Sequence, residues 1–359
     1  MIKFLLTMLV CSSVWAAELP IEVLKQEGNV VFSPYSAKVV LSMAAIGSKG
    51  ATNDEIAAIL GGFRIENFYG GFESAQAVII DKDFRCSKLY QQRIKTYFGG
   101  KFFPCNLRDN DPACLALVNG WAASKTHNLI PTLLEPQDID PNTVMLLLNA
   151  AYFKGKWASP FSPTSTKKAP FHGTTTSEVD MMQQEGYFSY SEDNAFSIIE
   201  LPYRTSHHDN FATAIILPKE GKTLSEVTSS LTMEKIRKWL KMERHYVELL
   251  LPRFTLEYRA DLRPILEKCG MKTAFSTAAD FSEICPNKPL SMSKVIQAAH
   301  IRVNEAGTEA SAATAASITM RSGPPEQKYT MRCDRPFLFL IYEKNTGAML
   351  FMCRVSSLS

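Results

Sequence analysis

One long stretch without core-forming residues constrains this chain more than any other feature. From Asn304 to Gln327 the sequence reads NEAGTEASAATAASITMRSGPPEQ, rich in Ala, Ser, Thr and Gly, and apolar, strand-like segments lie on both sides of it. Structureless connections beyond roughly 12 to 15 residues are usually functional or disordered. Because the flanking strands argue against a break between domains, we expect an exposed functional tether.

The C-terminal part of this stretch has the character of a protease cleavage site. Arg321 precedes Ser322 and Gly323, and a stiff Pro-Pro pair follows. Exposed, weakly structured segments are the preferred sites of proteolytic cutting. The alternative is a disordered linker, which the strands on both sides disfavour.

The rest of the chain predicts a mixed α+β fold. The 359 residues are 46% hydrophobic, enough for a large core. Apolar residues at helical spacing predict helices over residues 33–59, separated at Gly47 and Gly50, with Ser33 and Thr52–Asn53 as candidate caps. The run MLLLNAAYF lacks helical period and predicts a buried central strand, and residues from Phe171 onward are mostly strand-like. Helices dominate early and strands late, and no linker intervenes, so we expect one domain over residues 18–359.

The N-terminus, MIKFLLTMLVCSSVWAAELP, has the pattern of a secretory signal peptide. We expect cleavage after Ala16 or Ala17, so that residues 1–17 form the signal and the mature protein is secreted and extracellular. The alternative is a buried N-terminal helix. Of eight cysteines, seven follow Cys11, and an odd number leaves at least one unpaired or in an intermolecular bond.

Motifs for catalysis, metals and cofactors are missing from the sequence. It contains no GxSxG, HExxH, GxxxxGK[ST] or GxGxxG motif, so we expect no catalytic residue and no cofactor. The cysteines form no CxxC pair, and His207–His208 beside Asp209 lie in a polar stretch that we interpret as a solvated loop, so no metal is expected. A net charge of +3 predicts no nucleic-acid partner, and no stretch after the signal approaches the roughly 18 to 20 apolar residues of a membrane span.

A basic helical segment, TMEKIRKWLKMERH, interleaves cations with apolar residues. We favour an amphipathic helix with a solvated basic face. The alternative is a site for a sulfated glycosaminoglycan. Its cations are Lys235, Arg237, Lys238, Lys241 and Arg244.

Several long motifs, in order, resemble the serpin family of suicide-substrate protease inhibitors. They are NVVFSPYSAKVVLSMAAIGSKGAT, LLLNAAYFKGKW, VELLLPRFTLEYRADLRPILEKCGMKTAFSTAADFSEI, NEAGTEASAAT and DRPFLFLIYEKNTGAMLFMCRV, and the resemblance covers roughly residues 20 to 359. It implies an α+β serpin fold with three β-sheets, about eight helices and an exposed reactive-centre loop at about residues 305–327. It also implies a metastable active form, in which that loop can still insert as an extra strand of the central sheet.

The resemblance assigns roles within the loop. The implied hinge comprises Glu305, Gly307, Thr308, Glu309, Ala310, Ala312 and Thr314. Alternate residues of an inserting strand face the core, and Thr308, Ala310, Ala312, Thr314 and Ala316 are all small. Family spacing makes Arg321 the seventeenth residue counted from Glu305, so the reactive bond is expected at Arg321–Ser322, with trypsin-like specificity. Met320 is the alternative if the register shifts by one residue.

Further positions match two polar groups of the family. Ser33, Ser36, Asn149 and His300 match a shutter under the central sheet, with a hydrogen bond from His300 to Asn149 expected as the sheet opens. Arg253 and Glu305, beside Trp157, match a charge pair at the breach where the loop enters. The chain departs from the family in residues too few for a full first helix, a short 61–80 region where helix D belongs, and Cys353 in place of a usual Gly.

The implied function is that of a secreted inhibitor, not an enzyme. A trypsin-like serine protease attacks Arg321, forms an acyl-enzyme and is trapped in a covalent complex when the loop inserts. We expect the inhibitor to be a monomer. The alternative is a non-inhibitory serpin acting as a carrier or binding protein. Such proteins tend to have bulky, charged or Pro residues at inward hinge positions, and none of the inward hinge positions here, Thr308, Ala310, Ala312, Thr314 and Ala316, has one.

Overall fold

The fold is known from a computed structural model, which describes residues 15–66, 68, 70–108, 111–204, 210–239, 241–308 and 327–359. Most of the predicted signal peptide lies outside the described residues. So do the segment with His207 and His208 and most of the predicted reactive-centre loop, including Arg321 and Ser322.

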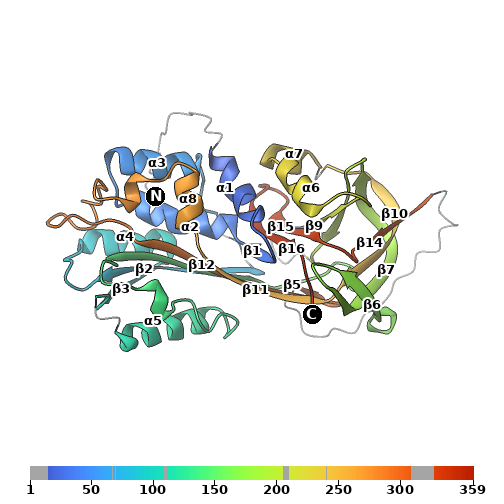
Figure 1. Ribbon diagram of the computed structural model, residues 1–359, viewed down its shortest axis with the longest axis horizontal. Coiled ribbons are helices and arrows are strands. Elements are labelled where there is room, and N and C mark those ends of the chain that lie inside the picture. The colour runs from blue at the N-terminus through green and yellow to red at the C-terminus, as the bar shows by residue number, and fades with distance from the viewer. Residues whose placement is uncertain are drawn as a thin grey trace.

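A seven-stranded sheet forms the centre of the molecule (Figure 1). Its order is β3 (Lys101–Cys105), β2 (Phe72–Asp81), β4 (Met145–Phe153), β12 (Lys294–Asn304), β13 (Gly307–Thr308) and β5 (Gly155–Lys156), with β11 (Phe254–Asp261) on the other edge of β12. Every residue of β4 is buried, as its unbroken apolar run predicted. β4 and β12 run parallel, and Asn149 is the register partner of Gln297.

The other strands form one continuous nine-stranded sheet. Its order is β1 (Val30–Phe32), β16 (Met349–Val355), β15 (Phe337–Glu343), β9 (Phe211–Pro218), β8 (Phe196–Pro202), β7 (Thr176–Glu192), β10 (Arg244–Pro252) and β14 (Lys328–Arg332), with β6 (Lys167–His172) on β7. We expected three sheets. Two of them merge here because the 17-residue β7 pairs with β6 and β10 through most of its length and with β8 through its last residues.

Eight α-helices lie in the described part of the chain. They are α1 (Trp15–Leu24), α2 (Pro34–Ala45), α3 (Gly50–Leu60), α4 (Lys88–Phe98), α5 (Pro112–Lys125), α6 (Leu224–Ser230), α7 (Met233–Trp239) and α8 (Arg263–Lys268), with 3-10 turns at Pro136–Asp138, Pro163–Ser165 and Thr273–Phe275. The predicted break after α2 and the cap at Ser33 are confirmed, since the Ser33 hydroxyl accepts a hydrogen bond from the Ser36 amide. The predicted cap at Thr52–Asn53 is wrong: α3 begins after Lys49, and the Thr52 hydroxyl instead accepts from the Asp280 amide.

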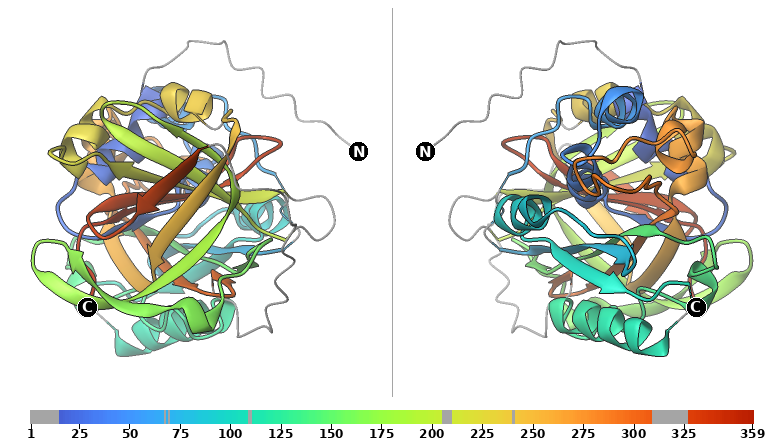
Figure 2. Two further views of the ribbon diagram at one scale, coloured as in Figure 1. Left: turned by 90° about the vertical axis from the view of Figure 1, so that its right-hand side faces the viewer. Right: turned by 90° about the vertical axis from the view of Figure 1, so that its left-hand side faces the viewer.

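Helices cover both faces of the central sheet. α2 lies on one side of it and α5 on the other (Figure 1), and the end-on views of Figure 2 show the same layering. Alternation along the strands explains this arrangement, because Leu147 and Val295 belong to the core cluster that includes α2, whereas Leu148 and Ile296 belong to the cluster that includes α5.

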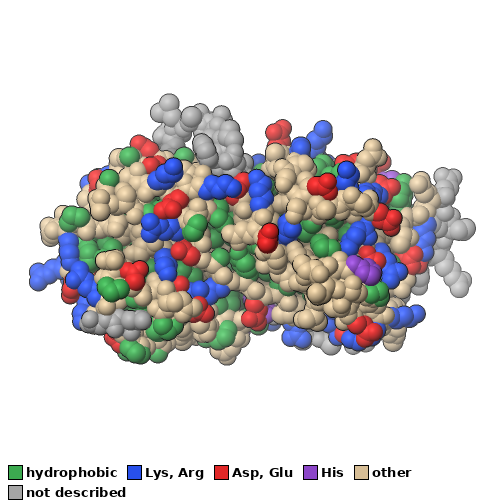
Figure 3. Space-filling view, viewed as in Figure 1, with side chains coloured by type: hydrophobic (Ala, Val, Ile, Leu, Met, Phe, Trp, Pro, Cys, Tyr) green, Lys and Arg blue, Asp and Glu red, His purple; other side chains and the backbone are tan. Residues whose placement is uncertain are grey.

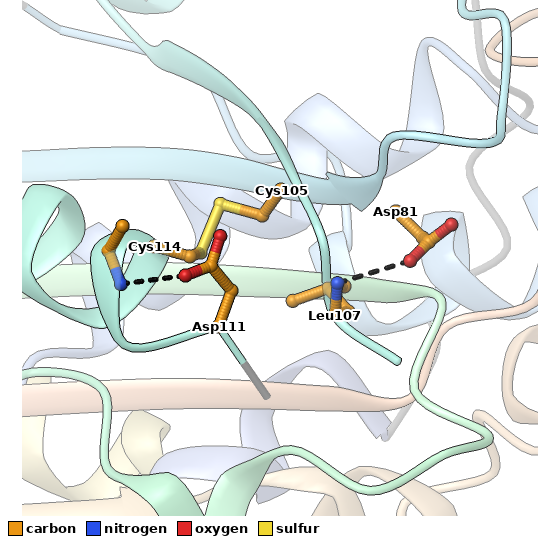
Figure 4. Close-up of a disulfide and its surroundings, with 6 residues drawn as sticks. Asp81, Cys105, Leu107, Asp111 and Cys114 are labelled. Carbon is orange, nitrogen blue, oxygen red and sulfur yellow. Dashed lines mark hydrogen bonds between the residues drawn. A yellow bond between two sulfur atoms is a disulfide. The ribbon is translucent and has the colours of Figure 1, made fainter. Parts of the chain in front are cut away.

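A disulfide ties α5 to the edge of the central sheet. Cys105, the last residue of β3, is bonded to Cys114 in the first turn of α5 (Figure 4). Carboxylates on both sides order the connection: Asp81 accepts from the Leu107 amide at 3.1 Å, and Asp111 caps the helix by accepting from the Ala113 amide at 2.9 Å. The helix that covers the sheet is thereby attached at its beginning to an outer strand.

Candidate functional site: the opening end of the central sheet

The first residues of the predicted hinge already form a strand. Thr308 pairs with Val303 of β12 on one side and with Gly155 of β5 on the other, and Gly307 pairs likewise with Asn304 and Lys156. β4 and β12 are direct partners as far as Tyr152 and His300, and beyond that point they separate to admit β13. The sheet therefore has an open end, and the chain leading into residues 309–326 enters it.

Thr308 is a small polar residue in a fully buried position. Its hydroxyl lies 2.7 Å from the Tyr203 hydroxyl, which in turn lies 2.6 Å from the Thr213 hydroxyl. Burial raises the pKa of Tyr203, so its phenol is neutral and can both donate and accept. The Tyr203 ring stacks on Trp157, with ring centroids 4.6 Å apart. This compact hydrogen-bonded pocket fits a short hydroxyl, and the described side chains that form it, those of Tyr203, Thr213 and Trp157, carry no charge.

Gly307 is required by the backbone at this entry point. Its φ angle of 154° is one that residues with a side chain rarely adopt. A Cβ atom there would lie 2.0 Å from the carbonyl oxygen of Gly155, which is a backbone atom and cannot move aside. Only glycine lets β13 lie this close to β5.

Glu305 anchors the hinge through an ion pair at the sheet top. Arg253 Nη2 donates to Glu305 Oε1 at 2.5 Å, and the Thr166 hydroxyl donates to the same oxygen at 2.7 Å. Burial by itself would raise the pKa of Glu305, but these two hydrogen bonds outweigh it and hold the pKa below its usual value. The Phe161 amide also donates to the Glu305 carbonyl at 2.9 Å.

Trp157 binds the backbone on both sides of Glu305. Its side-chain Nε1 donates to the Asn304 carbonyl and its backbone amide donates to the Ala306 carbonyl, both at 3.0 Å. The backbone on both sides of Glu305 is thus held in place without any group suited to bond chemistry.

A buried polar cluster lies under the middle of the sheet. The Ser36 hydroxyl donates to Asn149 Oδ1 at 2.7 Å, and Gln297 Nε2 donates to the same oxygen at 2.9 Å. Gln297 is also bound to Ser33, because its Oε1 accepts from the Ser33 amide at 2.8 Å and its Nε2 donates to the Ser33 carbonyl at 3.1 Å. The cluster therefore joins α2 to both β4 and β12, the two strands between which the resemblance implies that the loop inserts.

His300 does not belong to this cluster, which corrects its predicted assignment. It lies three residues after Gln297 on β12, and an odd separation along a strand places two side chains on opposite faces. His300 Nε2 lies 3.8 Å from Glu257 Oε1 on β11. Gln297 takes the expected place, and the signal that could have found it is a polar amide within the apolar run VIQAA.

The structure describes the predicted loop only as far as Thr308, apart from its last residue, Gln327. Beyond Thr308, the hinge positions Glu309, Ala310, Ala312 and Thr314 and the bond Arg321–Ser322 lie outside the described residues. Tyr203 and Thr166 contact the hinge but were missed by the sequence analysis, since neither stands in a recognisable pattern.

The basic helix has the arrangement expected of a solvated amphipathic helix. In α7 the side chains of Lys235, Arg237 and Lys238 are exposed while Ile236 is buried. Over the face seen in Figure 3, Lys and Arg side chains are interspersed with Asp and Glu. Among the described residues no group of three His, Cys, Asp or Glu side chains is placed to hold a metal ion.

In the part of the chain that the structure describes, α1 runs from Trp15 to Leu24, and the described residues between α3 and β2 contain no helix. Cys353 lies fully buried in β16. No helix in the described part of the chain is long and apolar enough to cross a membrane.

Comparison with known proteins places this geometry in one family. The family model described as "Serpin (serine protease inhibitor)" matches residues 16–358. Iripin-2 of Ixodes ricinus is 32% identical over 357 residues, covering 92% of this chain and 88% of that protein. Leukocyte elastase inhibitor A of Rattus norvegicus is 30% identical over 358 residues, covering 92% and 93%. The structure of human thyroxine-binding globulin complexed with thyroxine superposes with a TM-score of 0.84 at 25% identity, covering 98% and 99% of the two chains.

Proposed function

This chain belongs to the serpin family, and from that premise we propose that it is a secreted suicide-substrate inhibitor of a trypsin-like serine protease. The observation that carries the proposal is β13, because Gly307 and Thr308 lie between β12 and β5 as the first residues of a strand that the sheet can extend. The small residues that follow in the sequence, at Ala310, Ala312 and Thr314, could enter next without steric conflict.

Inhibition would depend on the relative rates of two steps, insertion of the loop and hydrolysis of the acyl-enzyme. The protease serine attacks the Arg321 carbonyl and forms an ester, releasing the new amino terminus at Ser322. Insertion of the loop between β4 and β12 then carries the tethered protease along the sheet and distorts its catalytic site before water can hydrolyse the ester. The inhibitor supplies no catalytic group, only the free energy gained when the loop joins the sheet.

Incubation with bovine trypsin followed by denaturing electrophoresis tests the proposal. We expect a boiling-resistant band near the summed masses of the two proteins, because the ester remains intact in the trapped complex. Arg321→Ala is the matched variant, and it should slow inhibition of trypsin by at least about 100-fold, since the acidic specificity pocket would lose its cationic partner. A cleaved product with no complex would contradict the proposal, and unchanged inhibition by Arg321→Ala would contradict the assigned bond.

A carrier or binding protein is the second candidate. The similarity to human thyroxine-binding globulin, solved in complex with thyroxine, supports it, because the fold alone does not require inhibition. Such a protein would be cut by trypsin within residues 309–326 without forming a complex. The electrophoresis experiment therefore separates the two candidates directly.

Secretion and polysaccharide binding are two further parts of the proposal. N-terminal sequencing of protein collected from the medium of expressing eukaryotic cells should begin after Ala16 or Ala17. Heparin-agarose tests the sulfated-polysaccharide alternative: elution of the wild type at clearly higher salt than Lys235→Ala/Lys238→Ala would support a site on α7. Equal elution would leave the solvated-face interpretation in place.

A further inference from the structure

We propose that Cys86 and Cys285 form a dithiol that oxidises to an intramolecular disulfide and restrains the far end of the central sheet. Nothing in the sequence pattern pairs these two residues, which are separated by almost 200 positions. Cys86 lies in the turn between β2 and α4, and Cys285 lies in the connection between α8 and β12.

Two hydrogen bonds hold the two segments side by side. The Ser87 amide donates to the Ile284 carbonyl at 2.8 Å, so the residues adjacent to the two cysteines are joined through their backbones. The Cys285 thiol donates at 3.6 Å to the carbonyl of Arg85, the residue directly before Cys86. The Cys285 thiol also lies near enough to Cys86 to help raise the pKa of its thiol. Neither thiol is in a disulfide here, in contrast to Cys105 and Cys114.

The Cys86 thiol is more accessible to solvent than the Cys285 thiol, and this difference determines which of them reacts first. Cys86 is partly exposed and Cys285 is buried. A small-molecule disulfide such as oxidised glutathione can therefore react first with the Cys86 thiolate, forming a mixed disulfide and releasing one glutathione thiolate. The Cys285 thiolate then attacks Cys86 Sγ and displaces the second glutathione. Two protein thiols lose two protons and two electrons, and one oxidised glutathione becomes two reduced molecules.

The surroundings of the Cys86 thiol make its reaction with oxidised glutathione slow at neutral pH. Burial, together with the neighbouring Cys285 thiol, raises the pKa of Cys86 to about 12. Because the thiolate is the nucleophile, little of the reactive form exists near pH 7. Bridge formation should accelerate steadily as the pH rises from 7 to 9.

The bridge would connect two parts of the sheet that must separate during insertion. Cys86 follows β2, which lies on the β4 side of the opening, whereas Cys285 precedes β12 on the other side. An added strand widens a sheet by roughly 4.8 Å, but the two Cα atoms of a disulfide stay within about 4.4 to 6.8 Å. α4 lies toward the left of Figure 1, whereas β5, next to the breach, lies right of centre, so the restraint acts away from the breach. This part of the inference rests on the proposed inhibitory function.

Oxidation of the folded protein with oxidised glutathione at pH 8.5 tests the pairing. We expect proteolytic digestion and mass spectrometry to yield a cross-linked peptide containing Cys86 and Cys285. Cys285→Ala should instead stop at a Cys86–glutathione adduct, and Cys86→Ser should take up no glutathione at this site. Failure of the wild type to form the cross-link, with both cysteines still alkylated after unfolding, would overturn the pairing.

The restraint is tested on the same samples with trypsin. We expect the oxidised wild type to need several-fold more inhibitor per trapped trypsin than the reduced wild type, with Cys86→Ser unaffected by oxidation. Equal stoichiometry in a fully cross-linked sample would overturn the restraint. If the reduced wild type traps no trypsin at all, the proposed function fails, while the mass-spectrometric result still decides the pairing.

Discussion

Thr308 is the last residue of β13, the short strand that leads into the predicted loop. Its side chain is completely buried between Tyr203 and the neighbouring strands, and its only polar atom is satisfied by the Tyr203 hydroxyl. A buried hydroxyl with a partner costs little, but a buried charge without one is expensive. In the proposed mechanism, the entry of the loop into the sheet therefore depends on the size and neutrality of the Thr308 side chain.

Replacing Thr308 with Arg should convert the protein from an inhibitor into a substrate. The guanidinium cannot be accommodated beside Tyr203, so insertion slows and hydrolysis of the acyl-enzyme overtakes it. The number of inhibitor molecules consumed per trapped trypsin should rise at least about tenfold. Thr308→Val, which keeps the shape and adds no charge, is the control and should remain inhibitory. Undiminished trapping by Thr308→Arg would refute insertion at this position.

The Glu305 carboxylate gives the breach a specific dependence on pH. Its pKa is lower in the folded protein than its ordinary value of 4.5, so its stabilising effect is complete above that value and is lost as the pH falls through the folded pKa. Glu305→Gln should destabilise the protein at pH 7 by about 1 kcal/mol, because the partner Arg253 is partly exposed. The gap between the urea midpoints of the two proteins should shrink by pH 3. A gap that is equal at both pH values would mean that the ion pair has no stabilising role.

At the scale of elements, the pairing of β4 with β12 is the part of the fold that would have to open in the proposed mechanism. They are joined by a parallel ladder and, under it, by the amides of Asn149 and Gln297 together with Ser33 and Ser36 of α2. On the opposite face α5 covers the same two strands. Opening the sheet thus requires a polar cluster on one face to rearrange and a helix on the other face to shift.

Removing the Cys105–Cys114 disulfide should loosen α5 selectively. The bond closes a loop over a separation of 9 residues, and losing that constraint on the unfolded chain should lower stability by about 2 to 3 kcal/mol. The double variant Cys105→Ser/Cys114→Ser should show faster hydrogen exchange in the first turns of α5. Exchange in β15 and β16 is the internal control and should not change. Uniformly faster exchange throughout the chain would indicate general destabilisation instead.

For the whole molecule, the proposed mechanism requires that the uncut protein is not at its lowest free energy. An inserted loop would add a central strand whose ladder hydrogen bonds contribute on the order of 1 kcal/mol each. β14 begins at Lys328, after the predicted bond at Arg321–Ser322. A cut at that bond would therefore separate the inserting part of the loop from β14.

Cutting the loop should therefore stabilise the protein. After limited cleavage within residues 309–326, the midpoint of thermal unfolding should rise by at least about 10 °C, since each kcal/mol corresponds to roughly 1 to 1.5 °C for a chain of 359 residues and a fully inserted strand adds many ladder hydrogen bonds. Circular dichroism of cut and uncut samples measures this shift. A carrier-type protein whose loop does not insert would show no rise, and that result would favour the second candidate function.

Much of the site was accessible from residue patterns, and the failures have a common cause. Glycine at position 307, small residues after it and the pairing of Arg253 with Glu305 followed from local chemistry and family spacing. His300 was assigned to the shutter because it is a polar residue in the expected strand, but a strand exposes its side chains alternately, and the face is set by register. The same limit applies to Tyr203, which reaches Thr308 from a strand end more than a hundred residues away in sequence.

By itself the sequence determined the helices within residues 33–59, the buried strand MLLLNAAYF and the small size of the residues that follow Glu305, because these depend on local periodicity, side-chain size and charge. Only the tertiary structure decided that Thr308 already lies between β12 and β5, that Gln297 joins α2 to the opening strands, and that Cys86 meets Cys285. Those contacts depend on strand register and on how distant segments pack. A side chain's type limits its possible partners, but only the complete packing selects among them.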